Sequence, residues 1–157
     1  MAHDACVTCR ANRGEIPAPG GVIYEDAHWR LEHTFEPIPM VGWLVLKPLQ
    51  HTESVADLTP DEAASLGPLL QRVAAAMTEV LTPVKVYVSL YAEAENAAHI
   101  HIHLIPRHEG MPADRLGPWV FHFLAEAHRE RRNLGDVETA TRAVEAIREA
   151  LRKDGAG

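Results

Sequence analysis

Three histidines alternate with large aliphatic residues in the segment 99–105, which reads His-Ile-His-Ile-His-Leu-Ile. A period of two over such residues predicts a β-strand, on which side chains two positions apart share one face. His99, His101 and His103 would then form a row of imidazoles, and the aliphatic residues between them would face a core. Folding does not require this row, because three groups that can each become cationic repel one another. The pattern therefore indicates a site that uses imidazole as a nucleophile, a proton carrier or a metal ligand.

The two cysteines of the chain, Cys6 and Cys9, are separated by two residues. A Cys-x-x-Cys pair is half of a zinc site, a redox pair or a chance occurrence. A redox pair is typical of a strand-to-helix junction, whereas this pair stands close to the N-terminus. A structural zinc ion needs four ligands, so two further nitrogen or sulfur donors would have to come from elsewhere in the chain. The spacing alone leaves these alternatives open.

The composition describes an ordinary globular domain. The chain has 157 residues, of which 46% are hydrophobic and 24% charged, enough for one domain with a substantial core. The formal net charge of −7 argues against a surface that coats nucleic acid and favours a small-molecule substrate. No apolar run is long enough to span a bilayer, and no signal peptide precedes Cys6. We therefore expect a cytoplasmic protein with neither nucleic-acid nor membrane partners.

Segments with strand character precede the histidine run and must position it. Residues 22–26 and 29–33 predict a hairpin of two short strands, and residues 42–48 predict a more apolar third strand, followed by a loop that carries His51. Residues 84–91 alternate as a fourth strand. The histidine run would be the fifth.

A long helix is expected between the third and fourth strands. Thr59 can cap it, Pro60 suits the first helical position, and Glu62 completes a capping box. An apolar stripe continues to residue 81 and predicts a face that packs on the core or on another subunit. Gly67-Pro68 lies inside this stripe, so the helix should kink or divide there.

The chain changes character after the histidine run. Residues 119–132 and 136–153 predict two further helices, and the apolar residues of the second repeat at spacings of three and four. That helix would pack on the body of the domain or on a second subunit. We expect the aromatic residues Trp119, Phe121 and Phe123 to belong to the core rather than to a ligand pocket.

Several short motifs occur in an order that is characteristic when they are taken together. Cys-x-x-Cys is followed by Gly-Glu-Ile-Pro at 14–17, by Tyr-Glu-Asp at 24–26, by Trp-Leu-Val-Leu-Lys-Pro at 43–48 with His51, and by the histidine run with Ile-Pro-Arg at 105–107. The chain resembles the histidine triad (HIT) superfamily of nucleotide hydrolases and transferases, in particular its zinc-containing Cys-x-x-Cys branch. The resemblance covers residues 1–110.

The resemblance implies an α+β fold, in which a five-stranded antiparallel sheet packs with a long helix. It also implies a homodimer that forms through this helix and an edge of the sheet. Residues 1–110 would be the histidine-triad core domain. Residues 111–157 would add C-terminal helices, a helical extension packed on the same domain or on the dimer.

The resemblance assigns a reaction to the histidines. The middle one, His101, would attack the α-phosphorus of a nucleotide substrate, and water would then release a nucleoside monophosphate from the nucleotidyl-imidazole. His103 would support this arrangement or contact a phosphate oxygen. A branch that transfers nucleotides to sugar phosphates has glutamine at this third position, so His103 favours a hydrolase of phosphoramidates or dinucleoside polyphosphates. Asn96 stands where relatives carry a serine or threonine that contacts the phosphate, and its amide can donate in the same way.

The resemblance also supplies the two missing metal ligands. In relatives with the cysteine pair, zinc is bound by the cysteines, by a histidine in the loop after the third strand and by the first triad histidine. The matching residues here are Cys6, Cys9, His51 and His99. A closed Cys₂His₂ shell leaves no position for water, so we expect a structural zinc ion that locks the N-terminus against the catalytic segment.

The chain departs from the family pattern at three places. The ribose-binding aspartate that is usual after the second strand has no clear counterpart, and Glu36 is the nearest residue. Glu-Asn-Ala-Ala at 95–98 replaces a Gly-Gln pair before the triad, and Gly42-Trp43 stands where many relatives have a histidine. Two alternatives follow: a nucleotide-binding regulatory module with little turnover, and a hydrolase in which triad histidines bind a catalytic metal. The remaining histidines receive no functional role, and they are His28, His33, His108, His122 and His128.

Overall fold

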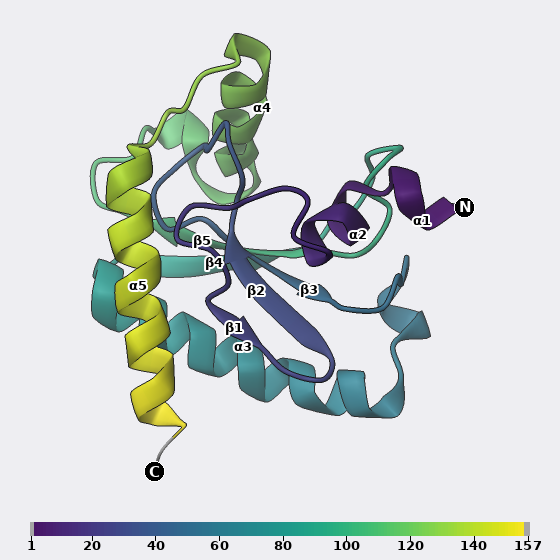
Figure 1. The fold of residues 1–157 in the computed structure, drawn as a ribbon. Helices are drawn as coiled ribbons and strands as arrows, with labels where there is room; N and C mark the ends of the chain where they lie inside the picture. The colour runs from purple at the N-terminus through teal and green to yellow at the C-terminus, as the bar shows by residue number, and fades with distance from the viewer. Residues whose placement is uncertain (1, 156–157) are drawn as a thin grey trace.

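The fold is an antiparallel five-stranded sheet with helices on both faces (Figure 1). A computed structural model describes residues 2–155. The strands are β1 (Tyr24–Glu25), β2 (Trp29–His33), β3 (Leu44–Pro48), β4 (Lys85–Ser89) and β5 (Ile102–Arg107), in the spatial order β1-β2-β3-β5-β4. The predicted α+β class is confirmed, and the first four predicted strands are present: β2 has the predicted bounds, whereas β1, β3 and β4 are shorter than predicted.

The register of the central strands separates two chemically different faces. Glu32 pairs with Val45, and Val45 pairs with His103, so these three side chains lie on one face. The neighbouring residues point to the other face, where Leu31, Leu46 and other aliphatic side chains form the main hydrophobic core. The sheet therefore presents a histidine-bearing polar face and an apolar core face.

The long helix α3 (Pro60–Leu81) covers the core face and begins at the predicted capping box. The Thr59 side chain accepts from the Glu62 amide, and the Glu62 carboxylate accepts from the Thr59 amide. Of the two outcomes predicted at Gly67-Pro68, a kink or a division, the division is wrong, since the helix continues through Pro68. A proline inside a helix costs about 3 kcal/mol, but burial of Leu69 and neighbouring apolar side chains contributes roughly 1.5–3 kcal/mol for each one. The free energy gained by burying these side chains therefore exceeds the cost of the proline inside the helix.

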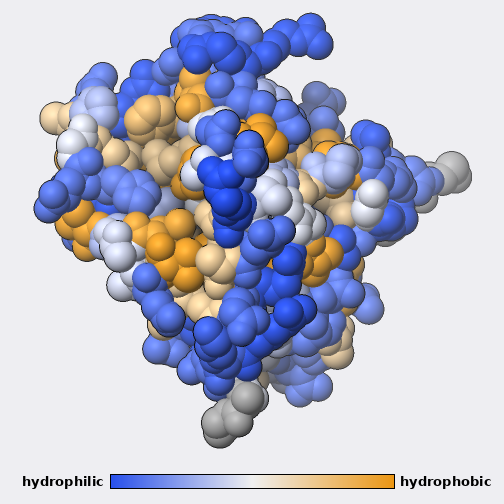
Figure 2. Space-filling view, turned by 60° about the vertical axis from the view of Figure 1, so that its left-hand side comes forward, coloured by the Kyte–Doolittle hydropathy of each residue, from blue (hydrophilic) through white to orange (hydrophobic). Residues whose placement is uncertain are grey.

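The C-terminal helices pack onto the same body. They are α4 (Phe121–Glu130) and α5 (Val137–Asp154), and Asp136 caps α5 by accepting from the Thr139 amide. Val144 and Ile147 of α5 belong to the main core beside α3, whereas charged side chains occupy its outer surface. Hydrophilic residues accordingly dominate the face in Figure 2, where hydrophobic residues form separate patches. The domain boundary at residue 110 stays a prediction.

Strand β5 begins later than the histidine pattern predicts. β5 starts at Ile102, so His99 and His101 precede the strand. Continuing the β3–β5 register would bring Ile100 opposite Pro48, which has no N–H group to donate to the ladder. The Ile100 amide instead donates to the Thr52 carbonyl (2.8 Å). Residues 99–101 therefore lie outside the sheet, where His99 and His101 make contacts other than strand pairing.

Two short helices lie at the N-terminus, and the second of them lies over the histidine-bearing face. They are α1 (Ala2–Ala5) and α2 (Val7–Asn12). The Val7 amide donates to the Asn96 carbonyl (2.8 Å), and the Asn12 side-chain amide donates to the Pro48 carbonyl (2.8 Å). These bonds hold α2 against the loops that flank the triad.

The connections contain three 3₁₀ turns, at Val55–Asp57, Ala113–Arg115 and Gly117–Val120. Within the described part of the chain, no helix has both the length and the apolar character that crossing a membrane requires.

The connector between α2 and β1 provides a matched test of packing. Gly20 (φ +72°) and Gly21 (φ +71°) are both left-handed, but only a Cβ at Gly20 would lie 2.6 Å from the Val144 side chain. We expect Gly21→Ala to lower the free energy of unfolding by about 1 kcal/mol through backbone strain. Gly20→Ala should lose about 1–3 kcal/mol more through overpacking against α5. Urea denaturation of both variants measures this difference, and equal losses would contradict the packing described here.

Candidate functional site

His101 is held in one orientation by the main chain of its own segment. Its ring Nδ1 lies 2.9 Å from the His99 carbonyl oxygen, so Nδ1 carries the proton and donates it to that oxygen. Burial lowers the pKa of His101 below its usual range, which keeps the ring neutral. The lone pair is therefore on Nε2, as a nucleophilic imidazole requires.

His103 is fixed in the complementary tautomer by Trp43. The Trp43 indole N–H donates to His103 Nδ1 at 3.0 Å, which assigns the imidazole proton to Nε2. Burial, together with the nearby His101, lowers the pKa of His103 to about 3, so this ring is also neutral. The His101 and His103 rings lie 5.0 Å apart, and Phe121 packs edge-on against His103 at 5.1 Å. The expectation that the three aromatic residues belong to the core is wrong for Trp119, which is 58% exposed, and it holds in part for Phe121, which packs on a core cluster but also contacts a triad ring.

A cavity of about 350 Å³ lies in front of these two rings. It brings His101 and His103 together with Asn96, as the sequence predicted, while His99 is not among its lining residues. The walls come from α2, the end of β2, strand β3, the loop before the triad, and α4. The lining residues are Val7, Thr8, Ala11, His33, Thr34, Phe35, Val45, Lys47, Ala94, Asn96, Ala97, His101, His103, Leu124 and His128.

A buried ion pair forms part of this wall, and the sequence analysis did not find it. Lys47 pairs with Glu32, and Arg30 also pairs with Glu32 at 2.8 Å. Lys47 and Glu32 are almost fully buried, and burial lowers the Lys47 pKa although Glu32 opposes this shift. A charged residue inside the apolar run 44–48 was the available signal, since lysine is rarely buried without a partner. A cation in the wall makes the cavity suitable for an anionic group.

His33 was given no role from sequence, yet it lines the cavity and supports its rim. Its Nδ1–H donates to the Thr34 carbonyl (2.8 Å), and its Nε2 accepts from the Gly42 amide (3.0 Å). Protonation of Nε2 would break the second bond. Burial accordingly lowers the pKa of His33.

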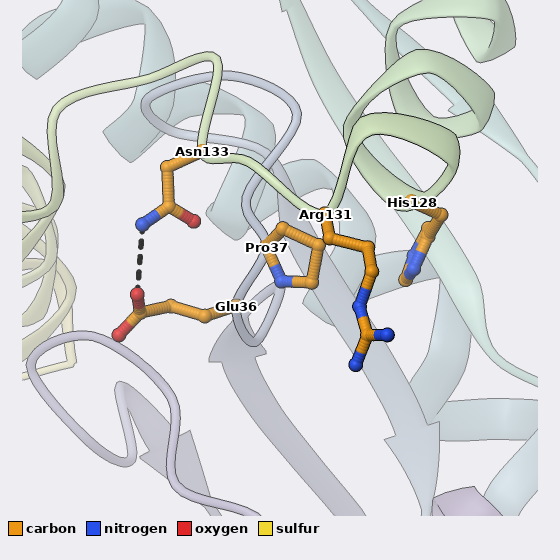
Figure 3. A pocket seen from close by; sticks show the side chains of 5 residues that line it. All are labelled: Glu36, Pro37, His128, Arg131 and Asn133. Atoms are coloured by element: carbon orange, nitrogen blue, oxygen red, sulfur yellow. Dashed lines mark hydrogen bonds between the residues drawn. The ribbon is translucent and has the colours of Figure 1, made fainter.

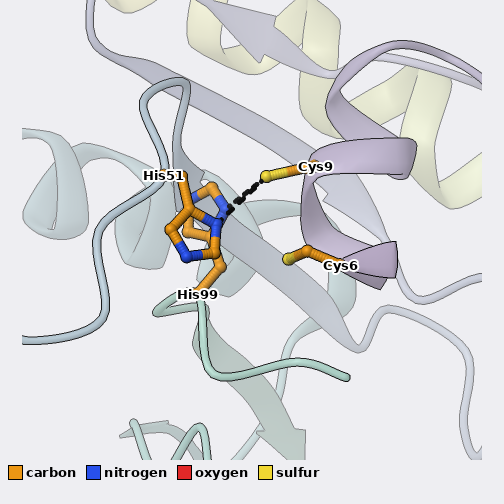
Figure 4. Close-up of side chains that lie close together, drawn as sticks. All are labelled: Cys6, Cys9, His51 and His99. Carbon is orange, nitrogen blue, oxygen red and sulfur yellow. Dashed lines mark hydrogen bonds between the residues drawn. The ribbon is translucent and has the colours of Figure 1, made fainter. Parts of the chain in front are cut away.

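The four predicted metal ligands converge on one point (Figure 4). Their ligand atoms all lie within 4.8 Å of one another. Cys6 and Cys9 come from the start of α2, His51 from the loop after β3, and His99 from the segment before β5. Cys9 Sγ lies 3.2 Å from His51 Nδ1 and 3.4 Å from His99 Nδ1. The cluster is positioned to bind a metal ion.

The surroundings of the cluster fit zinc. His99 Nε2 lies 3.1 Å from the Pro48 carbonyl, and His51 Nε2 lies 3.0 Å from the Glu53 carboxylate. Both rings therefore have an outer partner that directs Nδ1 toward the thiols, as outer-shell groups do in zinc sites. Burial, and the neighbouring Cys6, raise the pKa of Cys9 to about 11. A divalent cation would stabilise the buried thiolate, and two sulfur with two imidazole donors make the set typical of a structural zinc ion.

Removal of the metal should destabilise the N-terminal region and the triad segment together. We expect a strong chelator to lower the thermal midpoint of the wild-type protein by several degrees, because about 2 kcal/mol or more of linked binding energy is lost. Cys6→Ala/Cys9→Ala should start at the lower midpoint and show no response to the chelator. Metal content by elemental analysis and melting by circular dichroism provide the readouts. An unchanged wild-type midpoint after complete metal removal would contradict the structural role.

The buried neutral His33 predicts a pH dependence of stability. Its pKa is lower in the folded chain than in the unfolded one, so only the unfolded chain gains its proton as the pH falls below about 6.5. The free energy of unfolding should therefore decrease from pH 7 to pH 5, with at most about 1.4 kcal/mol per pH unit from this residue. His33→Gln can still accept from Gly42 and should show a shallower slope. The exposed control His122→Gln should keep the wild-type slope, and the same slope in both variants would contradict the assignment.

Comparisons with known proteins agree with this geometry. The HIT-domain family model matches residues 14–110. A Zn-bound histidine triad family protein from Mycobacterium smegmatis is 26% identical, covers 99% of each chain and gives a TM-score of 0.68. That alignment also includes the cysteine pair and the C-terminal helices, which lie outside the family-model match. No curated protein sequence matches the chain.

More distant structures share the fold alone. A hypothetical histidine triad nucleotide-binding protein from Sulfolobus tokodaii is 19% identical over 94% of this chain and 93% of its own, with a TM-score of 0.67. A uridylyltransferase is 18% identical over 96% of this chain and 46% of its own, with a TM-score of 0.66. The family model spans more than half of the chain, and its match includes the sheet and the triad; the chain therefore belongs to the histidine triad (HIT) family.

Proposed function

We propose that the protein is a nucleotide hydrolase that cleaves its substrate at the α-phosphate through a covalent nucleotidyl–His101 intermediate. Membership of the HIT family supports nucleotide binding with hydrolase or transferase activity in general. The observation that carries the finer proposal is the bond from His101 Nδ1 to the His99 carbonyl, which leaves a neutral Nε2 beside the cavity. The substrates we propose are phosphoramidates, dinucleoside polyphosphates or related nucleotidyl compounds.

The proposed reaction has two displacements at phosphorus. In the first, the Nε2 lone pair of His101 forms a bond to the α-phosphorus, and the bond from phosphorus to the leaving group breaks with its electron pair on the leaving group. An amine leaving group takes up a proton from solvent as this bond breaks. In the second, a water oxygen bonds to phosphorus, the phosphorus–nitrogen bond breaks, and its electron pair returns to Nε2. A proton from that water passes to solvent. The second product is a nucleoside monophosphate, and division into two steps lowers each barrier.

His103 has a supporting role in this proposal. Because Trp43 accounts for its Nδ1, its Nε2–H is the group that can donate a hydrogen bond to a phosphate oxygen. Asn96 lines the same cavity and can donate from its side-chain amide. The positive charge of Lys47 in the wall would favour the phosphate electrostatically. Histidine rather than glutamine at position 103 supports hydrolysis over transfer.

Zinc bound by Cys6, Cys9, His51 and His99 would act as a structural cross-link between α2, the loop after β3 and the triad segment. His101 is not a member of this cluster. Among the described residues, the cluster is the group of three or more potential metal ligands whose ligand atoms lie close together. This separation favours a nucleophilic role for His101 over the alternative in which triad histidines bind a catalytic metal.

A regulatory module with little turnover is a second candidate. The segment that replaces the usual Gly-Gln pair supports it, because the Asn96 carbonyl is occupied by the Val7 amide at 2.8 Å. Tight binding of a nucleoside monophosphate without measurable hydrolysis on a broad substrate panel would favour this candidate over the enzyme.

We also infer a homodimer. β4 is an edge strand of the sheet, and Val84 and Val88 on this edge are about half exposed, at 46% and 49%. Apolar residues on an unpaired edge favour association with a second copy. Light scattering of the purified protein distinguishes a dimer from a monomer.

Substitution of His101 tests the proposed reaction. We expect His101→Ala to lower the rate of hydrolysis of adenosine 5′-phosphoramidate and of diadenosine triphosphate by on the order of a thousandfold or more, because the attacking atom is lost. Product formation is followed by chromatography, and a base-quenched wild-type reaction should contain a nucleotidylated protein by intact mass spectrometry. The control His122→Ala alters an exposed histidine of α4 outside the cavity and should retain activity. Equal turnover by wild type and His101→Ala would defeat the proposal.

A further inference from the structure

A second depression adjoins the triad cavity at the C-terminal end of α4 (Figure 3). Its volume is about 370 Å³, and it is lined by Glu36, Pro37, His128, Arg131 and Asn133. His128 lines both this depression and the triad cavity. A ligand that extends out of the triad cavity past His128 would therefore enter the depression directly.

Arg131 is the cation of this depression, and its charge is not used inside the protein. The neighbouring Arg129 and Arg132 both pair with Glu130. Among residues 2–155, in contrast, no side chain forms an ion pair or hydrogen bond with the Arg131 guanidinium. An unpaired guanidinium offers a planar set of N–H donors that matches phosphate or carboxylate oxygens.

The single carboxylate of the depression does not neutralise this cation. The Glu36 carboxylate accepts from the Asn133 side-chain amide at 2.7 Å. Figure 3 shows Glu36 and Asn133 on one side of Pro37, and the Arg131 guanidinium on the other side, toward His128. The side that faces the triad cavity therefore keeps its positive charge.

The backbone conformation of Arg131 shows that this residue is not the most stable choice at its position. It ends α4 in the left-handed region, with φ 51° and ψ 42°. Glycine is favoured at this position of a helix C-terminus, because a Cβ makes the conformation unfavourable. Strain of this kind that the rest of the fold maintains is commonly associated with function.

We propose that the depression at Arg131 is the subsite for the leaving group of the substrate, and that it selects a leaving group that carries phosphate. The nucleotide would occupy the triad cavity, and the part beyond the α-phosphorus would pass His128 to reach the guanidinium. This inference rests on the proposed hydrolase reaction and narrows it. With this subsite, the preferred substrates are nucleotides linked through a phosphate chain, rather than phosphoramidates whose leaving group is an uncharged amine.

Two substrates that share the same nucleotide test this subsite. Diadenosine triphosphate releases ADP as its leaving group, whereas adenosine 5′-phosphoramidate releases ammonia. We expect Arg131→Gly to lower kcat/KM for diadenosine triphosphate by on the order of tenfold or more, because a charge-assisted hydrogen bond is lost. The value for the phosphoramidate should stay within about twofold of wild type. Arg131→Lys keeps the charge and should retain more activity on the triphosphate than Arg131→Gly.

Thr82→Gly is the matched control for the backbone effect. Thr82 ends α3 with φ 46° and ψ 46°, is exposed, and does not line the triad cavity or the depression. Both glycine variants should raise the thermal midpoint by about 2 °C through relief of strain. Only Arg131→Gly should change the ratio of kcat/KM values between the two substrates.

The outcomes separate this inference from the proposed function. Hydrolysis of both substrates by wild type, with no change or an equal loss in Arg131→Gly, would overturn the subsite and leave the hydrolase intact. Failure of wild type to hydrolyse either compound would overturn the hydrolase and the subsite with it. A selective loss on diadenosine triphosphate, with retained stability, supports the subsite.

Discussion

His99 connects the two chemical centres of this protein, and the arrangement of both depends on it. Its side chain points into the cysteine–histidine cluster, while its carbonyl accepts a hydrogen bond from His101 Nδ1–H. A shift of this one residue would change a metal ligand and the orientation of the proposed nucleophile together. The Pro48 carbonyl at the end of β3 accepts hydrogen bonds from His99 Nε2–H and from the Asn12 side-chain amide of α2, so the group that orients the His99 ring is itself tied to α2.

The histidine-bearing face of the sheet carries polar side chains that are almost fully buried. Glu32, Lys47 and His103 are buried there, and each has a named partner. Such groups are costly to bury unless they are paired and hydrogen-bonded. In the proposed reaction this face is preorganised, since neutral imidazoles with fixed tautomers would need no rearrangement when charge develops on a phosphate.

The sequence was sufficient for features that repeat or that match a known motif. Alternation of apolar and polar residues predicted strands of the sheet, and the capping box at Thr59 predicted the start of α3. The family resemblance predicted that Cys6 and His99 would be ligands of the same metal ion. Prediction from sequence failed where contacts between distant parts of the chain determine the local structure. The start of β5 depends on Pro48 in a neighbouring strand, and the continuity of α3 through Pro68 depends on burial against the sheet. The roles of Trp43 and Lys47 required the register that brings β3 beside β5 and β2.

The separation of the cluster's ligands along the chain has a consequence for biosynthesis. Cys9 and His99 are 90 positions apart, so both thiols leave the ribosome well before the last imidazole is made. Closing so long a loop is entropically unfavourable until strand pairing shortens it. During that interval the nascent chain carries two unprotected cysteines, and the completed sheet is what ends their exposure to oxidation.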